Sequence, residues 1–267
     1  MEPSSADAAL RPYRRPGFRH DWFLVSELVK RDFKSRYDRS VLGMFWCVLE
    51  PTLTMGLLYA VFSFFFRSAI PNFPLYLISG IVFYQFFTET TSSALRSIRE
   101  NAGLIAKVKV PLWTYPVTRA ASSLVNFLFA LIPLFAVVFL TRVPIRPSML
   151  LLLYSTACML LFALGVGLLL AALAVFFQDI AFLWGFACML FMYATPIFYP
   201  DTILLEGHHY MLYFNPLYHM IHFSRTVLNG AIPPAREFAA CALFAAVSLA
   251  VGLFVFRRLK NRFAQVL

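Results

Sequence analysis

The hydrophobic pattern divides the chain into six long apolar runs separated by polar connections. An α-helix rises about 1.5 Å per residue, so a run of roughly twenty apolar residues is long enough to cross the hydrocarbon core of a membrane. The pattern therefore predicts an all-α polytopic membrane protein with six transmembrane helices. The runs cover about residues 42–66, 74–94, 116–140, 149–177, 180–199 and 236–256.

The segment before the first run mixes apolar and basic residues at helical spacing. Trp22, Val25 and Val29 recur on one side of a helix drawn over residues 20–39, and the basic residues fall largely elsewhere. This pattern predicts an amphipathic helix that lies in the membrane interface. Residues 1–19 are polar and lack the apolar core of a signal peptide, so we expect a flexible tail there.

The connection between the last two runs is different from the others. Residues 200–234 are apolar and aromatic, yet they are interrupted repeatedly by Pro and Gly. We expect two short re-entrant helices, about 201–213 and 217–229, dipping into the outer leaflet where protein satisfies their backbone. With the interface helix, residues 40–260 would form one transmembrane domain, followed by a short cytoplasmic tail at 261–267.

The composition supports a membrane protein and excludes an ordinary soluble domain. Hydrophobic residues make up 60% of the 267 residues and charged residues 13%, and the mean hydropathy is +0.72, whereas soluble domains are about 25% charged. The net charge is +10. Lys and Arg concentrate before the first run, in the 95–113 loop and after the last run, which predicts that these parts and both termini are cytoplasmic. Topology and anionic lipids therefore explain the charge, and nucleic acid is not expected as a partner.

Neither the cysteines nor the histidines suggest a metal centre. The four cysteines lie apart within apolar runs and form no CxxC pair, so we expect no disulfide and no zinc site. Four of the five histidines fall within residues 200–234, where Asp201 and Glu206 are the nearby acids. Polar contacts near the outer surface are the expected role of these histidines.

Several short motifs occur in an order that is similar to that of a known family. They are "RDFKSRY" followed by "SVLGMFWCVLEP", then "NAGLIAKVKVP" at 101–111, "QDI" at 178–180, "TPIFYP" at 195–200 and "NP" at 215–216. Together they resemble the ABC-2 type membrane subunits that export polysaccharides, with Gln178 where the family has Arg. The resemblance covers roughly residues 20–260.

The resemblance implies a permease rather than an enzyme, so no catalytic residue is expected. It implies a homodimer in the bacterial inner membrane, joined to two separate ATPase subunits that hold ATP and Mg²⁺. The cargo would be a lipid-linked O-antigen or capsule polymer, with a teichoic-acid-type polymer as the alternative. The 267 residues contain no GxxxxGK[ST] phosphate loop, which agrees with hydrolysis on a partner.

Two groups of charged and polar residues are candidates for working parts. The resemblance implies that residues 95–111 form a coupling helix that contacts the ATPase, although a plain basic loop is the simpler interpretation. Charged residues inside a membrane usually pair or line a water path, so a polar cluster at the cytoplasmic mouth is expected from Glu50, Glu89 and Arg119. The alternative is that the three lie independently at the interface, with Arg119 extending toward the lipid headgroups. The coupling candidates are Arg99, Asn101, Gly103, Leu104, Ile105 and Lys107.

Aromatic residues make up 17% of the chain and could stack on sugar rings, although aromatic residues also fill helix interfaces and membrane belts. The channel candidates are Trp46, Tyr59, Tyr84, Phe87 and Tyr193. The candidates for an outer gate are Pro196, Tyr199, Tyr210, Asn215, Pro216, Tyr218 and Arg225.

Two other classes of function remain open. An integral membrane glycosyl or acyl transferase would need converging acids, histidines or a metal motif at one membrane face. A drug or lipid exporter of the same ABC-2 type would often carry a large external domain or a fused ATPase. The sequence shows neither pattern, so a polymer exporter is the preferred hypothesis.

Overall fold

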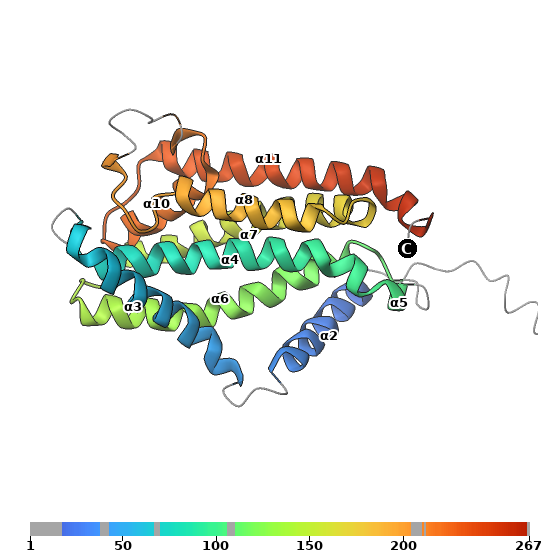
Figure 1. Ribbon diagram of the computed structural model, residues 1–267, viewed down its shortest axis with the longest axis horizontal. Helices are drawn as coiled ribbons and strands as arrows, with labels where there is room; N and C mark the ends of the chain where they lie inside the picture. Colours follow the sequence, from blue (N-terminus) through green and yellow to red (C-terminus); the bar gives the residue numbers. More distant parts are fainter. Residues whose placement is uncertain are drawn as a thin grey trace, which may run out of the picture.

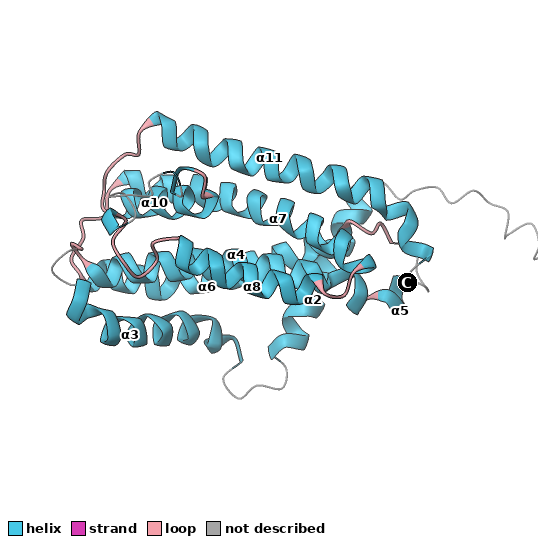
Figure 2. Cartoon of the chain, turned by 45° about the horizontal axis from the view of Figure 1, so that its top comes forward, coloured by secondary structure: helices cyan, strands magenta, loops and turns pink. Residues whose placement is uncertain are grey.

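The computed structural model describes residues 18–37, 43–66, 70–105, 110–203, 210 and 212–265. All regular structure among these residues is helical (Figure 2). The longer helices are α2 (Phe18–Tyr37), α3 (Trp46–Phe66), α4 (Phe73–Glu100), α6 (Thr114–Leu140), α7 (Leu152–Phe176), α8 (Ile180–Ala194), α10 (Pro216–Leu228) and α11 (Ala235–Leu259). The short elements are η1 (Gly43–Phe45), α5 (Ala102–Ile105), η2 (Pro147–Leu151) and η3 (Lys260–Gln265).

The long helices lie roughly side by side, and α2 and α3 are inclined to them (Figure 1). Helix α4 packs against α6 and α7, and α7 also packs along α11. The main core joins these helices to α10 through fully buried side chains such as Phe83, Met159 and Phe223. Figure 1 places α2, α5 and the C-terminus at one end of the bundle, and α10 at the other.

Two glycines allow α7 and α11 to pack closely. A Cβ atom added to Gly252 would lie 2.1 Å from the carbonyl oxygen of Gly165, and one added to Gly165 would lie 2.4 Å from the carbonyl carbon of Ser248. No side chain fits in either position. The Ser248 hydroxyl donates to the carbonyl of Phe162 at 2.9 Å, which joins the two helices further. Small residues at such crossings permit close contact between membrane helices.

Four helical segments among the described residues have the length and apolar composition needed to cross a membrane. They are Trp46–Phe66, Thr114–Leu140, Pro147–Phe176 and Ala235–Phe263. Helix α8 is apolar but has 15 residues, and α4 carries charged residues in its last turns. The all-helical character predicted from the sequence is confirmed for the described residues. The crossing of the membrane by α4 and α8 stays a prediction.

Three segments outside the predicted spans can be compared with the structure: the N-terminal tail, the helix before the first span and the two short helices after residue 200. A helix, α2, is found where the interface helix at 20–39 was expected, and its position in the membrane interface stays a prediction. The second short helix expected after residue 200, at 217–229, is found as α10, which starts at Pro216 with Asn215 as its N-cap. The first short helix, expected at 201–213, includes residues outside the described part of the chain, so it stays a prediction. The N-terminal tail at 1–19 also falls largely outside the described residues.

Candidate functional site

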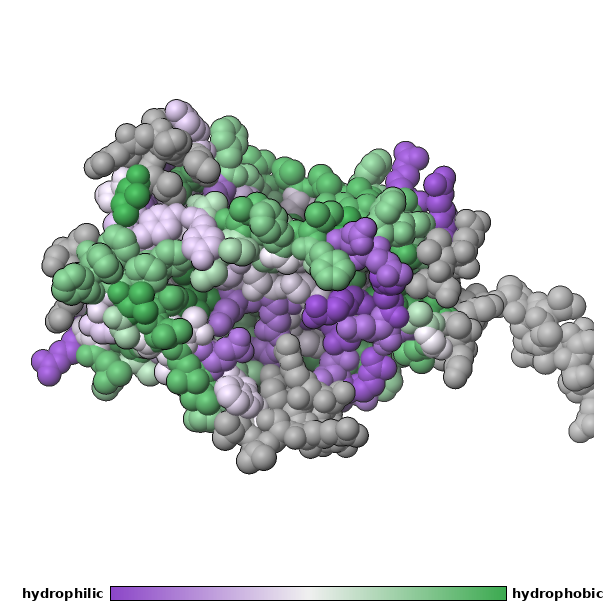
Figure 3. Space-filling view, viewed as in Figure 1, coloured by the Kyte–Doolittle hydropathy of each residue, from purple (hydrophilic) through white to green (hydrophobic). Residues whose placement is uncertain are grey.

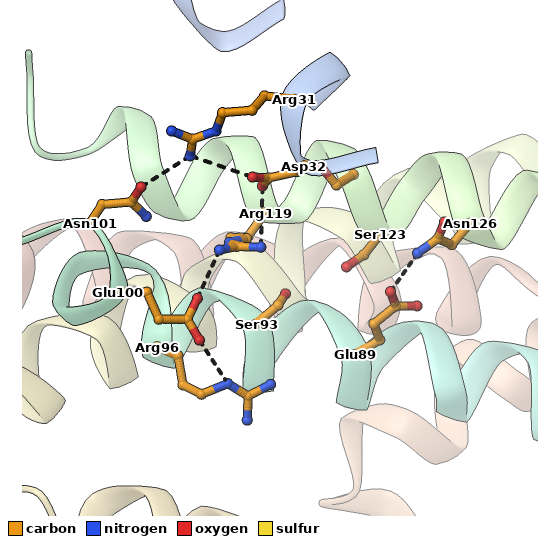
Figure 4. A pocket seen from close by; sticks show the side chains of 11 residues that line it. Arg31, Asp32, Glu89, Ser93, Arg96, Glu100, Asn101, Arg119, Ser123 and Asn126 are labelled. Carbon is orange, nitrogen blue, oxygen red and sulfur yellow. Dashed lines mark hydrogen bonds and ion pairs between the residues drawn. The ribbon is translucent and has the colours of Figure 1, made fainter. Parts of the chain in front are cut away.

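A polar pocket of about 460 Å³ lies where α2, α4 and α6 meet (Figure 4). The last half of α4 places Glu89, Ser93, Arg96 and Glu100 on one face, since these residues are three or four positions apart. Helix α6 contributes a similar stripe. The pocket is lined by Arg31, Asp32, Glu89, Ser93, Arg96, Glu100, Asn101, Arg119, Ser122, Ser123 and Asn126.

Charge pairs tie the three helices together at the outer part of this pocket. Arg119 of α6 contacts Asp32 of α2 at 3.3 Å and Glu100 of α4 at 2.8 Å. Glu100 also pairs with Arg96 at 3.5 Å. Because Asp32 and Arg119 keep only 10% and 25% of their side-chain surface exposed, the pair that they form is less screened than a surface pair.

The inner part of the pocket is held by an amide and a carboxylate. Asn126 Nδ2 donates to Glu89 Oε1 at 2.6 Å, and the Cys47 thiol of α3 donates to Asn126 Oδ1 at 3.6 Å. Figure 4 shows Glu89 and Asn126 facing each other between α4 and α6, with Ser123 near them.

A second pocket of about 390 Å³ continues from the first between α3, α4 and α6. Glu89 and Asn126 line both pockets, so the two form one polar groove. The second pocket adds Trp46, Glu50, Gln85, Thr88 and Ser92 to that groove, together with Cys47, Pro51, Val82, Phe86, Phe127 and Ala130.

The predicted polar cluster of Glu50, Glu89 and Arg119 is distributed along this groove. Arg119 and Glu89 line the first pocket, and Glu50 and Glu89 line the second. The ion pairs of Arg119 are with Asp32 and Glu100, two residues that the sequence reasoning did not select. Glu100 belongs to a repeat of polar residues every three or four positions on α4, which hydropathy averaging hides. Asp32 lies on α2 and leaves no such signal in the sequence.

The expected coupling residues lie at the end of the bundle that contains α2. Asn101 is buried as the C-cap of α4, where it donates to the carbonyl of Ser97 at 2.8 Å and accepts from Arg31 at 3.0 Å. Gly103 and Arg99 are exposed, and Leu104 is partly buried. Ile105 packs against an internal apolar cluster. Lys107 lies outside the described residues.

The five aromatic channel candidates occupy three different environments. Trp46 and Tyr193 are exposed, with 44% and 56% of their surface accessible. Tyr59 is partly buried beside Phe73, and the Tyr84 hydroxyl donates to the carbonyl of Cys188. The fifth candidate is Phe87.

The expectation that Phe87 lines a channel is corrected. Its ring is 1% exposed and packs against Phe162, Trp184 and Phe191. A side chain enclosed by its own subunit presents no surface to a polymer. Phe87 therefore belongs to the core that α4, α7 and α8 share.

Arg225 lies at the opposite end of the bundle and is buried, with 7% of its surface exposed. Its Nη1 donates to the carbonyl of Pro196 at 2.7 Å, and its Nη2 donates to the carbonyls of Tyr76 and Ile197, both at 3.1 Å. The guanidinium also lies over the Tyr76 ring, 3.4 Å from its centroid. Gly80 leaves room for it, because a Cβ there would lie 2.7 Å from Nη2.

Asn215 joins the same junction. Its side chain caps α10 by accepting from the backbone N–H groups of Leu217 and Tyr218, and it donates to the Thr195 hydroxyl at 2.9 Å. Pro216 is the first residue of α10. Asn215 therefore fixes both the start of this helix and its position beside the end of α8.

The outer gate stays a prediction. Pro196, Asn215 and Arg225 are buried inside the subunit, where they hold α10 against its neighbours. Tyr218 donates to Asp201 at 3.3 Å, and the Tyr199 hydroxyl donates to the carbonyl of Tyr193 at 2.5 Å. Tyr210 is exposed.

The surface separates into polar and apolar areas. Figure 3 shows hydrophilic residues gathered around α2 and the neighbouring parts of α4, with apolar surface over much of the rest of that face. In the described part of the chain, no group of three His, Cys, Asp or Glu residues is arranged to hold a metal ion. The arrangement is suited to binding polar molecules at one end of a membrane bundle.

Comparison with known proteins gives relatives that match nearly the whole chain. An O-antigen export system permease protein of Klebsiella pneumoniae is 31% identical over 256 residues, which cover 94% of this chain and 96% of the relative. A protein of the same description from Myxococcus xanthus is 28% identical over 91% of this chain and 94% of its own length. A polysialic acid transport protein of Escherichia coli is 23% identical over 91% of this chain and 96% of its own length.

These similarities agree with the sequence motifs and with the helical bundle. The model of the ABC-2 type transporter family matches residues 24–229, which include most of α2 and all of α3 to α8 and α10. The protein belongs to the ABC-2 type transporter family.

Proposed function

We propose that this chain is the membrane-spanning permease subunit of an ATP-driven exporter that moves a polysaccharide of the O-antigen or capsule type across the bacterial inner membrane. The observation that carries this proposal is the 31% identity to an O-antigen export permease along 94% of the chain. The polar groove among α2, α3, α4 and α6 supports it, because an apolar bundle needs a hydrophilic surface to conduct a hydrophilic polymer.

The working unit in this proposal is a homodimer with six membrane-crossing helices in each subunit and two separate ATPase subunits. Both termini and α5 face the cytoplasm, in agreement with the excess of Lys and Arg at that end. Helix α10 is a re-entrant helix in the outer leaflet. The cargo is lipid-linked, and its lipid part stays in the bilayer while the sugar chain passes between the subunits.

The α5 region receives the movement of the ATPase. Asn101 precedes α5 and accepts a hydrogen bond from Arg31 of the interface helix. Glu100, next in the chain, pairs with Arg119 of α6. A push on α5 therefore reaches α2 and α6 through contacts of about 3 Å, which border the polar groove.

Complementation tests the function directly. A strain that lacks its own O-antigen permease but keeps its exporter ATPase is supplied with this chain, and surface polymer is measured with a specific antibody. Restored surface polymer supports the proposal. Accumulation of polymer inside the cell, with the protein present in the membrane and a competent ATPase, would contradict it.

A pair of variants separates coupling from assembly. Leu104→Asp is expected to abolish export and the ATPase response while the protein still inserts, because it charges the contact surface of α5. Gln178→Asp adds the same charge to the exposed turn between α7 and α8 and is expected to keep export. Equal export by both variants would contradict a role of α5 in coupling to the ATPase.

A further inference from the structure

We propose that the groove lined by the two polar pockets is a saccharide-binding subsite that accepts neutral, hydroxyl-rich chains and disfavours anionic ones. This inference rests on the proposed function and narrows its substrate class. It concerns the part of the groove around Glu50, Gln85, Glu89, Ser123 and Asn126, with Trp46 at the side.

The groove is long enough to hold more than a single small ion. Its two halves have volumes of about 460 and 390 Å³, and ligand pockets usually range from about 300 to 1,000 Å³. The halves meet at Glu89 and Asn126. A chain of a few sugars therefore fits along α4, with the ion pairs of α2 at one end and α3 at the other.

The three arginines of the groove are occupied by groups of the protein. Arg119 contacts Asp32 and Glu100, and Arg96 contacts Glu100. Arg31 donates to Asn101 and lies 3.6 Å from Asp32. An anionic ligand would have to compete with these carboxylates, so the outer half offers a balanced rather than a positive surface.

The described side chains of the inner half of the groove include acidic and no basic residues. Glu50 and Glu89 line it, and none of its described lining residues is Lys or Arg. Carboxylates accept hydrogen bonds from the hydroxyl groups of neutral sugars, and a carboxylate can accept from two neighbouring hydroxyls. A carboxylate on the ligand would instead be repelled, which is how a site rejects the wrong partner.

Polar groups beside these carboxylates complete a hydrogen-bonding surface. The Ser122 hydroxyl is buried without a hydrogen-bond partner among the described residues, and Ser123, which is 2% exposed, lines the same first pocket. Figure 4 places it between Arg119 and Asn126 on α6. Gln85 and Thr88 of α4 add donors and acceptors to the second pocket. Such convergent polar groups fix a ligand that has many hydroxyls.

Trp46 gives the groove an aromatic side. Its ring is 44% exposed and lines the second pocket with Glu50. The C–H face of a sugar ring is apolar and packs on indole, while the hydroxyls at its edge reach the carboxylates. This combination of indole, amide and carboxylate suits a neutral sugar better than a phosphate or a sialic acid.

Binding to the purified full chain in phosphatidylcholine nanodiscs tests the subsite without the ATPase. Saturation-transfer NMR is recorded with a neutral mannose hexasaccharide and with a hexamer of sialic acid. The neutral probe is expected to bind at least about tenfold more tightly, the effect of losing one or two hydrogen bonds to charged groups. Equal or tighter binding of the sialic acid hexamer would overturn the selectivity, and binding of neither would overturn the subsite.

Variants connect the binding to the named residues. Glu50→Gln and Glu89→Gln keep the side-chain shape. Each is expected to lower the affinity for the neutral probe about tenfold and to reduce the preference of the groove for the neutral over the anionic probe. Glu27→Gln makes the same change at an exposed position of α2 outside both pockets and should leave binding unchanged. The proposal would be contradicted if Glu50→Gln, Glu89→Gln and the unchanged chain bound the neutral probe with equal affinity. If one of the two variants folds poorly, the other one still gives the test.

A lipid headgroup is the other source of hydroxyls at this depth. Replacing phosphatidylcholine by phosphatidylglycerol is expected to leave the mannose probe bound. Loss of binding in phosphatidylglycerol would assign the groove to a lipid instead of the sugar chain. Complementation of export is unaffected by these outcomes, so failure of the subsite and failure of the exporter function remain distinguishable.

Discussion

Helices α8 and α10 are close in sequence and similar in length, yet the more apolar one is the less buried. Helix α8 has no buried residue, and Phe182 and Phe186 are 81% and 61% exposed. Helix α10 contains Arg225, Ser224 and two histidines, and eight of its 13 residues are buried. In water the reverse would be expected.

The difference follows from the surroundings that each helix needs. In the bilayer where the sequence predicts α8, its apolar surface would have no cost, so hydrophobicity alone gives no reason for it to pack inside. The polar groups of α10 need partners, because an unsatisfied polar group in hydrocarbon costs several kcal/mol. Burial in this protein therefore follows the demand for hydrogen bonds as much as it follows apolar character.

The largest expected contrast comes from removing one aromatic ring from each helix. Phe223→Ala in α10 should lower the free energy of unfolding by about 4 kcal/mol, since its ring is fully buried and packs against Phe238. Phe186→Ala in α8 should change it by less than about 0.5 kcal/mol. Thermal unfolding of the purified chain in detergent measures both, and equal losses would contradict the difference in burial between α8 and α10.

Removing the buried cation should have the next largest effect. Arg225→Met removes the hydrogen bonds that the guanidinium donates to the carbonyls of Pro196, Ile197 and Tyr76. The Pro196 and Tyr76 carbonyls keep a second side-chain donor, so the carbonyl of Ile197 is the most affected, and a loss of about 3 kcal/mol is expected. Arg236→Met, on the exposed start of α11, is the matched control and should be nearly neutral. Arg225→Lys should recover little, because one ammonium cannot replace the planar fork. Full recovery by Lys would show that charge alone matters.

Replacing a glycine by alanine tests how closely the backbone of each region is packed. Gly80→Ala should cost about 2 kcal/mol, because the new Cβ would meet Arg225 Nη2 at 2.7 Å and Ile197 at 3.1 Å. Gly185→Ala in α8 has no atom within 4 Å and should be neutral or slightly stabilising. Unfolding midpoints in the same detergent compare them directly, and a loss at Gly185 equal to that at Gly80 would contradict the exposed position of α8.

The smallest effect is expected at the helix cap. Asn215→Ala removes the acceptor for two backbone N–H groups of α10 and should cost about 1 kcal/mol. Asn215→Asp keeps this acceptor and loses the donor to Thr195, so its stability should lie between those of the unchanged chain and Asn215→Ala. Hydrogen exchange of the first turn of α10 reports the change, and unaltered protection in Asn215→Ala would rule out the capping role.

Hydropathy predicted the helices well where membrane thickness determines their length. The run at 116–140 is found as Thr114–Leu140 and the run at 236–256 as Ala235–Leu259. The run at 74–94 continues as a helix to Glu100, because residues past the apolar part remain helical without being apolar. The run at 180–199 ends early at Ala194, where Pro196 follows.

The site was predicted less completely because its partners are distant in sequence. Glu50, Glu89 and Arg119 were found as charges in apolar runs, but Asp32 and Asn126 gain their meaning only when α2 and α6 are brought beside α4. The assignment of gate residues came from family resemblance. It did not anticipate burial, since backbone carbonyls that accept from a side chain leave no pattern in a sequence.

The hydrogen bonds from Arg225 to main-chain carbonyls affect how the sequence can change in evolution. The acceptors around Arg225 are main-chain oxygens of residues 76, 196 and 197, which any amino acid supplies. Drift at residue 197 can therefore alter the side chain while the contact with the cation is kept. The position that must change together with Arg225 is Gly80, because a larger residue there takes the space of the guanidinium. Covariation between homologues should accordingly link residue 225 with residue 80. It should not link residue 225 with residues 196 and 197, whose main-chain oxygens accept its hydrogen bonds.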